Sequence, residues 1–349
     1  MPPSRPRRSG PVRAEFALIK LLQAQVRRSD PQVIRGIGDD TAVIRTSASE
    51  WTLMTTDLLA DGVHFDPATS PFEDIGYRAA IANLSDIAAM GGTPRFMLVA
   101  IAIPPTGSTN QIQRLYRGMM QAVRPYRVSL IGGDTSASTQ GLFVSITLTG
   151  TVKPHRVLLR SGAQVGDHLY VTGTLGDSHA GLGLLRTPAG RGSNTLRPTH
   201  ARFLLRRHHR PSARIAEGQW LIRHGLSGAA IDLSDGLTGD LTHLCEESRV
   251  GAELFPAALP LSPACRAYAT SRGLDAVDIA LQGGEDYELL FTVPAAQQGR
   301  FERLAACTDF RFTCIGRITS RRSGLRLRTE QGTTHPLVVT SYEHFLRPC

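Results

Sequence analysis

The clearest structural signal in this chain is the stretch Asn83-Leu84-Ser85-Asp86-Ile87-Ala88-Ala89-Met90-Gly91-Gly92, which an apolar run at 97–103 follows. Ile75 and Ala79 precede it at helical spacing, so we expect a helix over 71–90 that ends at the two glycines. The near-continuous apolar run predicts a buried strand. A helix followed by such a strand indicates an α/β fold.

The rest of the sequence alternates predicted helices and strands on both sides of this stretch. We expect helices at 14–25, 110–123, 179–185, 212–224, 237–247 and 297–306, strands at 42–44, 53–56, 129–131, 142–149, 169–172, 229–233 and 287–293, and a surface loop at 187–199. Residues 153–167 read as a connection, so a domain boundary is expected near 150–165. The predicted class is α/β (α+β), with a disordered basic extension at 1–13, an N-terminal domain at 14–155 and a C-terminal domain at 156–349.

The composition indicates an ordinary folded protein that works in a reducing compartment. Of the 349 residues, 41% are hydrophobic and 20% are charged, which is enough apolar material for a core. No run of about 18 apolar residues occurs, and the first residues lack an apolar stretch, so neither a membrane helix nor a secretory signal is expected. The five cysteines form no CxxC pair, which argues against a zinc site and favours the cytoplasm.

The net charge of +9 comes almost entirely from arginine. Such a chain can attract nucleic acid, but its arginines cluster without interleaved aromatic residues, so nucleic-acid binding is not favoured. His208 and His209 lie within one of the arginine clusters, and we expect them on a solvated helix face.

The acidic residues, in contrast, gather in short motifs rich in Gly, Ser and Thr, mostly where an apolar run ends. These motifs are Gly36-Ile37-Gly38-Asp39-Asp40, Thr55-Thr56-Asp57, Asn83-Leu84-Ser85-Asp86, Gly132-Gly133-Asp134-Thr135, Asp232-Leu233-Ser234-Asp235-Gly236 and Gly283-Gly284-Glu285-Asp286. Any single one could be a turn or a helix cap. Carboxylates gathered in one place repel each other unless cations neutralise them, and Mg²⁺ prefers such oxygen ligands. Together the motifs predict a multi-metal polyphosphate site.

Phosphate binding in this chain cannot use the common lysine-based loops. No GxxxxGK[ST] motif is present, and neither of the two lysines, Lys20 and Lys153, could serve one. Arg160 is a candidate phosphate clamp, because a guanidinium makes bidentate phosphate contacts; the alternative is a solvated charge between domains. GxSxG and HExxH motifs are also absent.

The motifs, in this order, resemble the thiamine-monophosphate kinase family. The resemblance extends from about residue 14 to 346 and rests on the acidic motifs above together with Glu15-Phe16, His64-Phe65, Arg160-Ser161-Gly162-Ala163, Val171-Thr172-Gly173-Thr174-Leu175-Gly176-Asp177-Ser178 and Arg210-Pro211-Ser212. It implies a two-domain PurM-like fold, as in aminoimidazole-ribonucleotide synthetase. It also implies a homodimer, whose N-terminal domains form a β-barrel across the dimer.

The resemblance further implies a role for each matching residue. Several Mg²⁺ ions would be held by Asp40, Thr55, Thr56, Asp57, Asp86, Asp134, Asp232 and Asp235. ATP would contact Tyr116, Gly133, Asp134, Arg160 and Ser234. Thiamine monophosphate would contact His64, Glu285 and Tyr342, whose aromatic face suits a cationic thiazolium. Asp57, Asp134, Asp232 and Arg160 would be the catalytic set.

The implied reaction is direct in-line transfer of a phosphoryl group from ATP to thiamine monophosphate, with Mg²⁺ and without a phosphoenzyme. Two alternatives remain open at this point. One is a hydrogenase-maturation enzyme of the same superfamily, which would use a C-terminal cysteine, here Cys349. The other is a non-catalytic binder of nucleotides or nucleic acid. A selenophosphate synthetase would need a reactive cysteine near the N-terminus, whereas the first cysteine is Cys245. Neither a nucleic-acid nor a membrane partner is expected.

Overall fold

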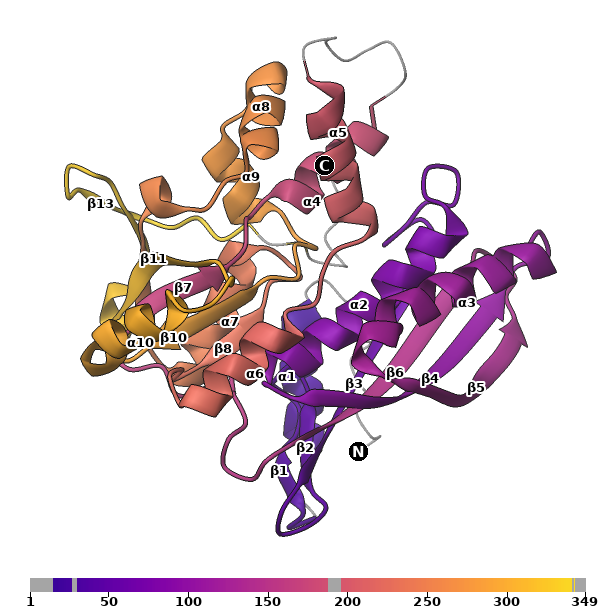
Figure 1. Cartoon of the computed structure of the whole chain (residues 1–349), viewed down its shortest axis with the longest axis horizontal. Helices are drawn as coiled ribbons and strands as arrows, with labels where there is room; N and C mark the ends of the chain where they lie inside the picture. The colour runs from indigo at the N-terminus through magenta and orange to yellow at the C-terminus, as the bar shows by residue number, and fades with distance from the viewer. Residues whose placement is uncertain (1–14, 27–29, 188–195, 341, 343–349) are drawn as a thin grey trace, which may run out of the picture.

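The computed structural model describes residues 15–26, 30–187, 196–340 and 342. It contains two sheets, one in each half of the chain, with helices packed on and between them (Figure 1). The predicted extension at 1–13, Cys349 and most of the predicted loop at 187–199 lie outside the described residues.

The N-terminal half forms a six-stranded sheet in the order β1-β2-β3-β6-β4-β5. Its elements are α1 (Glu15–Gln25), β1 (Val33–Arg35), β2 (Ala42–Arg45), β3 (Trp51–Ala60), α2 (Phe72–Ala89), β4 (Thr93–Ile103), α3 (Thr109–Val123), β5 (Ser129–Ala137) and β6 (Phe143–Val152). Neighbouring strands are antiparallel except β4 and β5, which are parallel because α3 provides the crossover between them.

One face of this sheet is covered by helices, and the other is open. Trp51, Leu53 and Leu59 of β3 are buried under the helices, whereas Met54 and Leu58 alternate with them and are exposed. The same alternation continues along β4. Within a single chain the sheet is open, with β1 and β5 at its edges.

The C-terminal half forms a seven-stranded, mostly antiparallel sheet in the order β13-β12-β9-β11-β7-β10-β8. Its strands are β7 (His168–Thr172), β8 (Ala230–Asp232), β9 (Gly251–Leu254), β10 (Leu289–Val293), β11 (Phe312–Thr319), β12 (Leu325–Arg328) and β13 (Thr334–Pro336). Its helices are α4 (Asp177–Leu185), α5 (Pro198–His209), α6 (Ile215–His224), α7 (Leu237–Ser248), α8 (Pro263–Arg272), α9 (Ala276–Gln282) and α10 (Gln298–Ala305). Figure 1 shows α4, α5, α8 and α9 grouped at one end of the molecule.

Helix α2 joins the two halves. It packs against α3 and the N-terminal sheet, and it also contacts α6, β8 and α5. Two glycines allow this close packing: a Cβ on Gly118 of α3 would lie 1.7 Å from the carbonyl oxygen of Glu73, and a Cβ on Gly218 of α6 would lie 2.1 Å from that of Ala88. One continuous core therefore runs from the N-terminal sheet through α2 to the C-terminal sheet.

Most of the predicted elements are confirmed, with ends that differ by a few residues. The predicted helix at 71–90 and the predicted strand at 97–103 form α2 and β4. The predicted helix at 212–224 begins later, at Ile215. The sequence patterns missed β1, β9, α8, α9, β11, β12 and β13. Among the described residues, no helix combines the length and the apolar character needed to cross a membrane.

Candidate functional site

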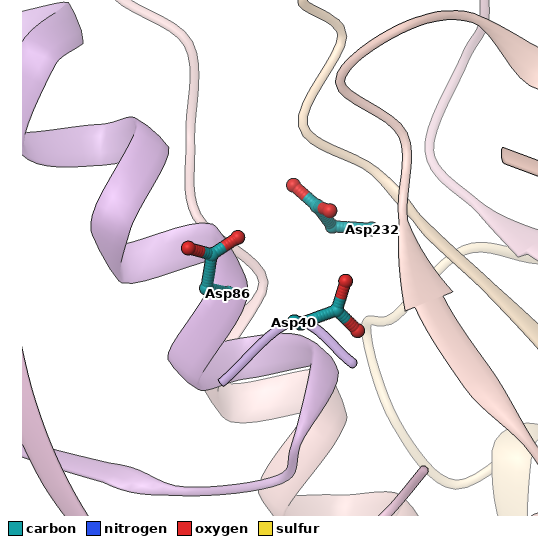
Figure 2. A group of neighbouring side chains, drawn as sticks. All are labelled: Asp40, Asp86 and Asp232. Atoms are coloured by element: carbon teal, nitrogen blue, oxygen red, sulfur yellow. The ribbon is translucent and has the colours of Figure 1, made fainter. Parts of the chain in front are cut away.

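Three carboxylates from distant parts of the chain meet where the two halves join. Asp40 lies between β1 and β2, Asp86 in the last turn of α2, and Asp232 at the end of β8. Each offers an oxygen within 4.8 Å of the others'. Figure 2 shows the three side chains converging, with Asp86 on its helix and Asp232 at the end of its strand. The cluster forms only because α2 places the two sheets against each other.

Hydroxyl groups orient two of these acids. The hydroxyl of Thr55, on the buried face of β3, donates to Oδ2 of Asp86, and the hydroxyl of Ser85 donates to Oδ2 of Asp232 at 2.7 Å. Asp240, on α7, accepts from the main-chain N–H groups of Asp235 and Gly236 at 3.2 and 3.1 Å, which fixes the loop after β8. Asp86 and Asp232 are thus each held by a hydroxyl from another element.

Burial and mutual repulsion raise the pKa of several of these carboxyls. Burial, followed by the charge of Asp235, raises the pKa of Asp57 to about 6. Burial, followed by the charge of Asp40, raises the pKa of Asp232 to about 8. Asp86 has its pKa raised well above the ordinary range, by burial and then by Asp57, Asp232 and Asp40. The cluster therefore holds its negative charges at a cost in free energy.

Arg160, in the connection between β6 and β7, supplies a nearby positive charge. Its Nε and Nη2 donate to Oδ1 of Asp40 at 3.1 and 2.5 Å, and its main-chain N–H donates to Oδ1 of Asp39 at 3.1 Å. Burial alone would lower the pKa of Arg160, but Asp40, Asp39 and Asp232 raise it. The guanidinium therefore stays charged and has a fixed orientation at the edge of the cluster.

The donor set fits a hard divalent cation. Oδ2 of Asp40 and Oδ2 of Asp57 are buried and lack a hydrogen-bond partner within the described part of the chain. Ionised oxygens in that situation are costly unless a cation binds them. Carboxylates combined with a threonine hydroxyl are oxygen ligands of the kind that Mg²⁺ prefers.

Two of the predicted metal-binding residues lie apart from the cluster. Thr56 follows Thr55 on β3, so its side chain points to the opposite face of the sheet, where its hydroxyl bonds to that of Thr147 at 3.2 Å. Asp134 lies on the edge strand β5, and its neighbour Gly133 pairs with Val99. Because β6 and β4 separate β5 from β3, about 14 Å separates the backbones of these two strands within one chain.

Tyr116, the predicted adenine contact, lines a cavity of about 370 Å³ at the start of α3. The other lining residues are Ile103, Gly107, Ser108, Thr109, Ile112 and Gln113. The cavity lies beyond the carboxylates along the sheet, since Thr55 and Asp57 align through β6 with Met97 and Val99 of β4, whereas Ile103 is the last residue of that strand. Such an opening could accept a flat apolar ring.

The three predicted substrate residues do lie near one another. Arg78 of α2 donates from Nη2 to the main-chain carbonyl of His64 and from Nη1 to Oε2 of Glu285 at 3.0 Å. Burial, followed by the charge of Glu285, raises the pKa of Tyr342. The main-chain N–H of Tyr342 donates to the carbonyl of Asp235 at 3.4 Å, which links this group to the acidic loop.

One prediction about this region is wrong. His208 is not on a solvated helix face: only 2% of it is exposed, and its Nε2 lies 2.7 Å from Nη1 of Arg78. The arginine-rich context hid the apolar side of α5, where Leu204 and His208 are both buried. Sequence reasoning also missed Arg78 and Asp240, since a single arginine or aspartate within a helix gives no signal of its own.

The N-terminal half of the chain, which contributes Asp40 and Asp86 to the cluster, matches a known domain family. Residues 38–152 match that family under the description "AIR synthase related protein, N-terminal domain". Over nearly its whole length, the chain also matches proteins of one enzyme family. It is 38% identical over 337 residues to the thiamine-monophosphate kinase of Escherichia coli strain K12, covering 96% of this chain and 99% of that one. The chain belongs to the thiamine-monophosphate kinase family.

Solved structures agree with this assignment. AaThiL complexed with AMPPCP and TMP matches with a TM-score of 0.81 and 33% identity, covering 95% of this chain and 97% of that one. Thiamine-monophosphate kinase from Stenotrophomonas maltophilia K279a matches with a TM-score of 0.72 and 36% identity, covering 91% and 96%. The hydrogenase maturation protein HypE of E. coli has a TM-score of 0.68 at 20% identity, covering 93% and 97%, so it shares the fold alone.

Asp57→Asn should raise the thermal stability of the metal-free protein at pH 8. The pKa of Asp57 is raised from 3.8 to about 6, so the folded chain binds this proton more tightly than the unfolded chain does. The carboxylate therefore destabilises the fold increasingly as pH rises through that window, by about 1–3 kcal/mol once fully ionised. Thermal melting in EDTA at pH 4 and pH 8 measures this, and the gain should vanish at pH 4.

The matched control is Asp278→Asn, an exposed acid on α9. It should leave the melting temperature within about 1 °C at both pH values. A metal-free Asp57→Asn protein that melts below wild type at pH 8 would contradict the repulsion described for this cluster.

Proposed function

We propose that this protein transfers the γ-phosphoryl group of ATP to thiamine monophosphate, which yields thiamine diphosphate. The observation that supports this most strongly is the acidic cluster of Asp40, Asp86 and Asp232 beside Arg160, within a chain of this family. Its relatives bear the name thiamine-monophosphate kinase, and AaThiL has been solved with AMPPCP, an ATP analogue, and TMP. The weaker HypE likeness gives no comparable support to the hydrogenase-maturation alternative.

The chemistry of the acceptor agrees with direct in-line transfer. A phosphate monoester oxygen is already a nucleophile at neutral pH, so no strong general base is needed. The main obstacle is repulsion between two anionic phosphates. When bound, Mg²⁺ would neutralise phosphate charge and align the reacting oxygens. Arg160 would add a fixed guanidinium at the same place, since its ion pair with Asp40 sets its orientation.

We infer that several Mg²⁺ ions are held by Asp40, Thr55, Asp57, Asp86, Asp232 and Asp235, which lie on or beside the cluster. The ionised carboxylates and the Thr55 hydroxyl are the donors. Ser234 and Arg160 would contact the nucleotide phosphates from the loop after β8 and from the connection before β7. As the family resemblance implies, we also keep Thr56 and Asp134 among the proposed metal ligands. We keep Gly133, Asp134 and Tyr116 among the proposed ATP contacts.

The distance of Asp134 from the cluster supports a homodimer. Gly133 and Asp134 lie on the edge strand β5, and Tyr116 lines a cavity beside the end of β4. A second chain at this edge could bring another copy of the cluster or close the nucleotide site. The open face of the sheet exposes Met54, Leu58, Phe96, Leu98 and Ile131, an apolar surface suited to burial against a partner. We propose that two such faces pack together and form the barrel across the dimer.

His64, Glu285 and Tyr342 would bind the thiamine part of the acceptor. Nδ1 of His64 accepts from the N–H of Ala60 at 3.0 Å, so the ring is neutral and its proton is on Nε2. Glu285 would face the cationic part of thiamine, and Tyr342 would pack on it. The proposed domains, 14–155 and 156–349, would each supply one side of this site. A cytoplasmic location fits the four free cysteines of the described chain and the need for ATP.

Purified protein with ATP and Mg²⁺ should form thiamine diphosphate from thiamine monophosphate and not from thiamine. Asp57→Asn should lower kcat at least about 100-fold, because a buried metal-site carboxylate is lost. Coupled ADP release together with chromatographic detection of thiamine diphosphate measures both. The control Asp278→Asn should remain within about twofold of wild type. Folded protein that binds ATP without turning over thiamine monophosphate would overturn the proposed function.

The open sheet face predicts a dimer in solution. Leu98→Lys places a charge in the middle of that face and should weaken dimerisation at least about 100-fold, because an unpaired charge would be buried. The control Leu274→Lys, which changes an exposed leucine outside the sheet, should leave dimerisation unchanged. Sedimentation equilibrium of both variants and wild type is the measurement. A wild-type protein that remains monomeric at about 100 μM would contradict the dimer.

A further inference from the structure

Arg78 is a buried arginine that no part of the proposed reaction uses directly. It lies in the second turn of α2 and is 2% exposed. Its guanidinium reaches three partners on three segments: the main-chain carbonyl of His64, Oε2 of Glu285 at 3.0 Å and Nε2 of His208 at 2.7 Å. Two of these partners are residues proposed to contact thiamine monophosphate, and they come from opposite halves of the chain.

His208 acts as a neutral acceptor in this network. Burial, followed by the charge of Arg78, lowers its pKa to about 2, so the ring is uncharged at neutral pH. Because Nε2 accepts from Arg78, the proton is on Nδ1, which lies 3.0 Å from Oγ of Ser178. Ser178 belongs to α4, and its main-chain N–H donates to Oδ1 of Asp286 at 3.1 Å. The network thus returns to the residue that follows Glu285.

The backbone around Glu285 is held in an unusual conformation. Glu285 and Tyr287 have φ values of +62° and +53°, in the left-handed region that non-glycine residues rarely adopt. Their N–H groups donate to the carbonyls of Ser234 and Leu233 at 2.8 and 2.9 Å. The strained segment is therefore tied to the loop that contains Asp235. Strain of this kind persists where the surroundings fix it, and it is frequent at binding sites.

The side chain of Glu285 remains accessible despite these contacts. Both Arg78 and His208 approach its Oε2, at 3.0 and 3.5 Å, and 25% of the side chain is exposed. Part of the side chain therefore remains open to a bound molecule while Oε2 is held. On the other side, Arg78 fixes the main chain of His64, whose ring is set by its bond from Ala60.

We propose that Arg78 is a positioning residue for the acceptor: it holds His64 and Glu285 at the spacing that thiamine monophosphate requires, and His208 fixes Arg78 in turn. This inference rests on the proposed function. The planar guanidinium can satisfy all three acceptors at once, which the single ammonium of lysine cannot do in the same geometry. Arg160, not Arg78, pairs with Asp40, so the nucleotide and metal side of the site should be unaffected.

Steady-state kinetics of Arg78→Lys, with ATP and thiamine monophosphate varied separately, tests the proposal. The KM for thiamine monophosphate should rise at least about tenfold, while the KM for ATP should change less than about threefold. The matched control is Arg210→Ala. Arg210 follows α5 and pairs with Asp74 of α2 at 2.5 Å, so this variant removes an ion pair to the same helix without touching His64 or Glu285. It should change neither KM by more than about threefold.

A second pair of variants decides the matter if Arg78→Lys does not fold. His208→Gln keeps an acceptor for Arg78, and His208→Leu removes it. The Leu variant should raise the KM for thiamine monophosphate at least about tenfold, and the Gln variant should recover most of that loss. A merely structural role would give equal losses in both variants, or equal rises in both KM values.

The outcomes separate this inference from the proposed function. Wild-type turnover with an unchanged KM for thiamine monophosphate in Arg78→Lys and His208→Leu would overturn the positioning role alone. Absence of wild-type turnover with thiamine monophosphate would overturn the proposed function, and the positioning role would fall with it.

Discussion

The main physical constraint on this structure is the repulsion among buried carboxylates at the junction of its two halves. Asp40, Asp86 and Asp232 approach within 4.8 Å, and burial raises the pKa of each. This repulsion destabilises the metal-free fold, but it favours the binding of cations together with phosphate, because cations neutralise the carboxylates. The packing that assembles the cluster must therefore offset the cost. The continuous core through α2, with its close glycine contacts to α3 and α6, provides that packing.

Helix α2 also sets the dimensions of the site. Arg78, near its start, organises the proposed thiamine contacts, and Asp86, in its last turn, belongs to the acidic cluster. Asp86 lies eight positions after Arg78 in the sequence, so about 12 Å lies between the two along the helix axis. This distance is similar to the length of a thiamine monophosphate molecule that extends from the proposed thiamine contacts to the acidic cluster. A single rigid helix can thus keep the two ends of the acceptor in register with the chemistry.

Much of this could be predicted from the sequence because acids and glycines at the ends of apolar runs leave a local pattern. The stretch that forms α2 and β4, and the acids at 40, 86 and 232, were predicted in this way. The buried polar network could not be, since Arg78 lies in an ordinary helical context and His208 among arginines that suggest a solvated surface. The separation of Asp134 from the cluster could not be predicted either, because the order of strands in the sheet cannot be read from the Gly132-Gly133-Asp134-Thr135 motif.

The most direct test of the account is the number of protons released when the metal-free protein binds Mg²⁺ and AMPPCP at pH 6.5. Calorimetry in buffers of different ionisation enthalpy gives this number, after subtraction of the protons that AMPPCP itself releases to Mg²⁺. Because the pKa of Asp232 is raised to about 8, that of Asp57 to about 6 and that of Asp86 well above the ordinary range, cation binding should displace at least about one proton per chain. Saturation without proton release would show that the carboxylates are already ionised, and would contradict the repulsion on which this account rests.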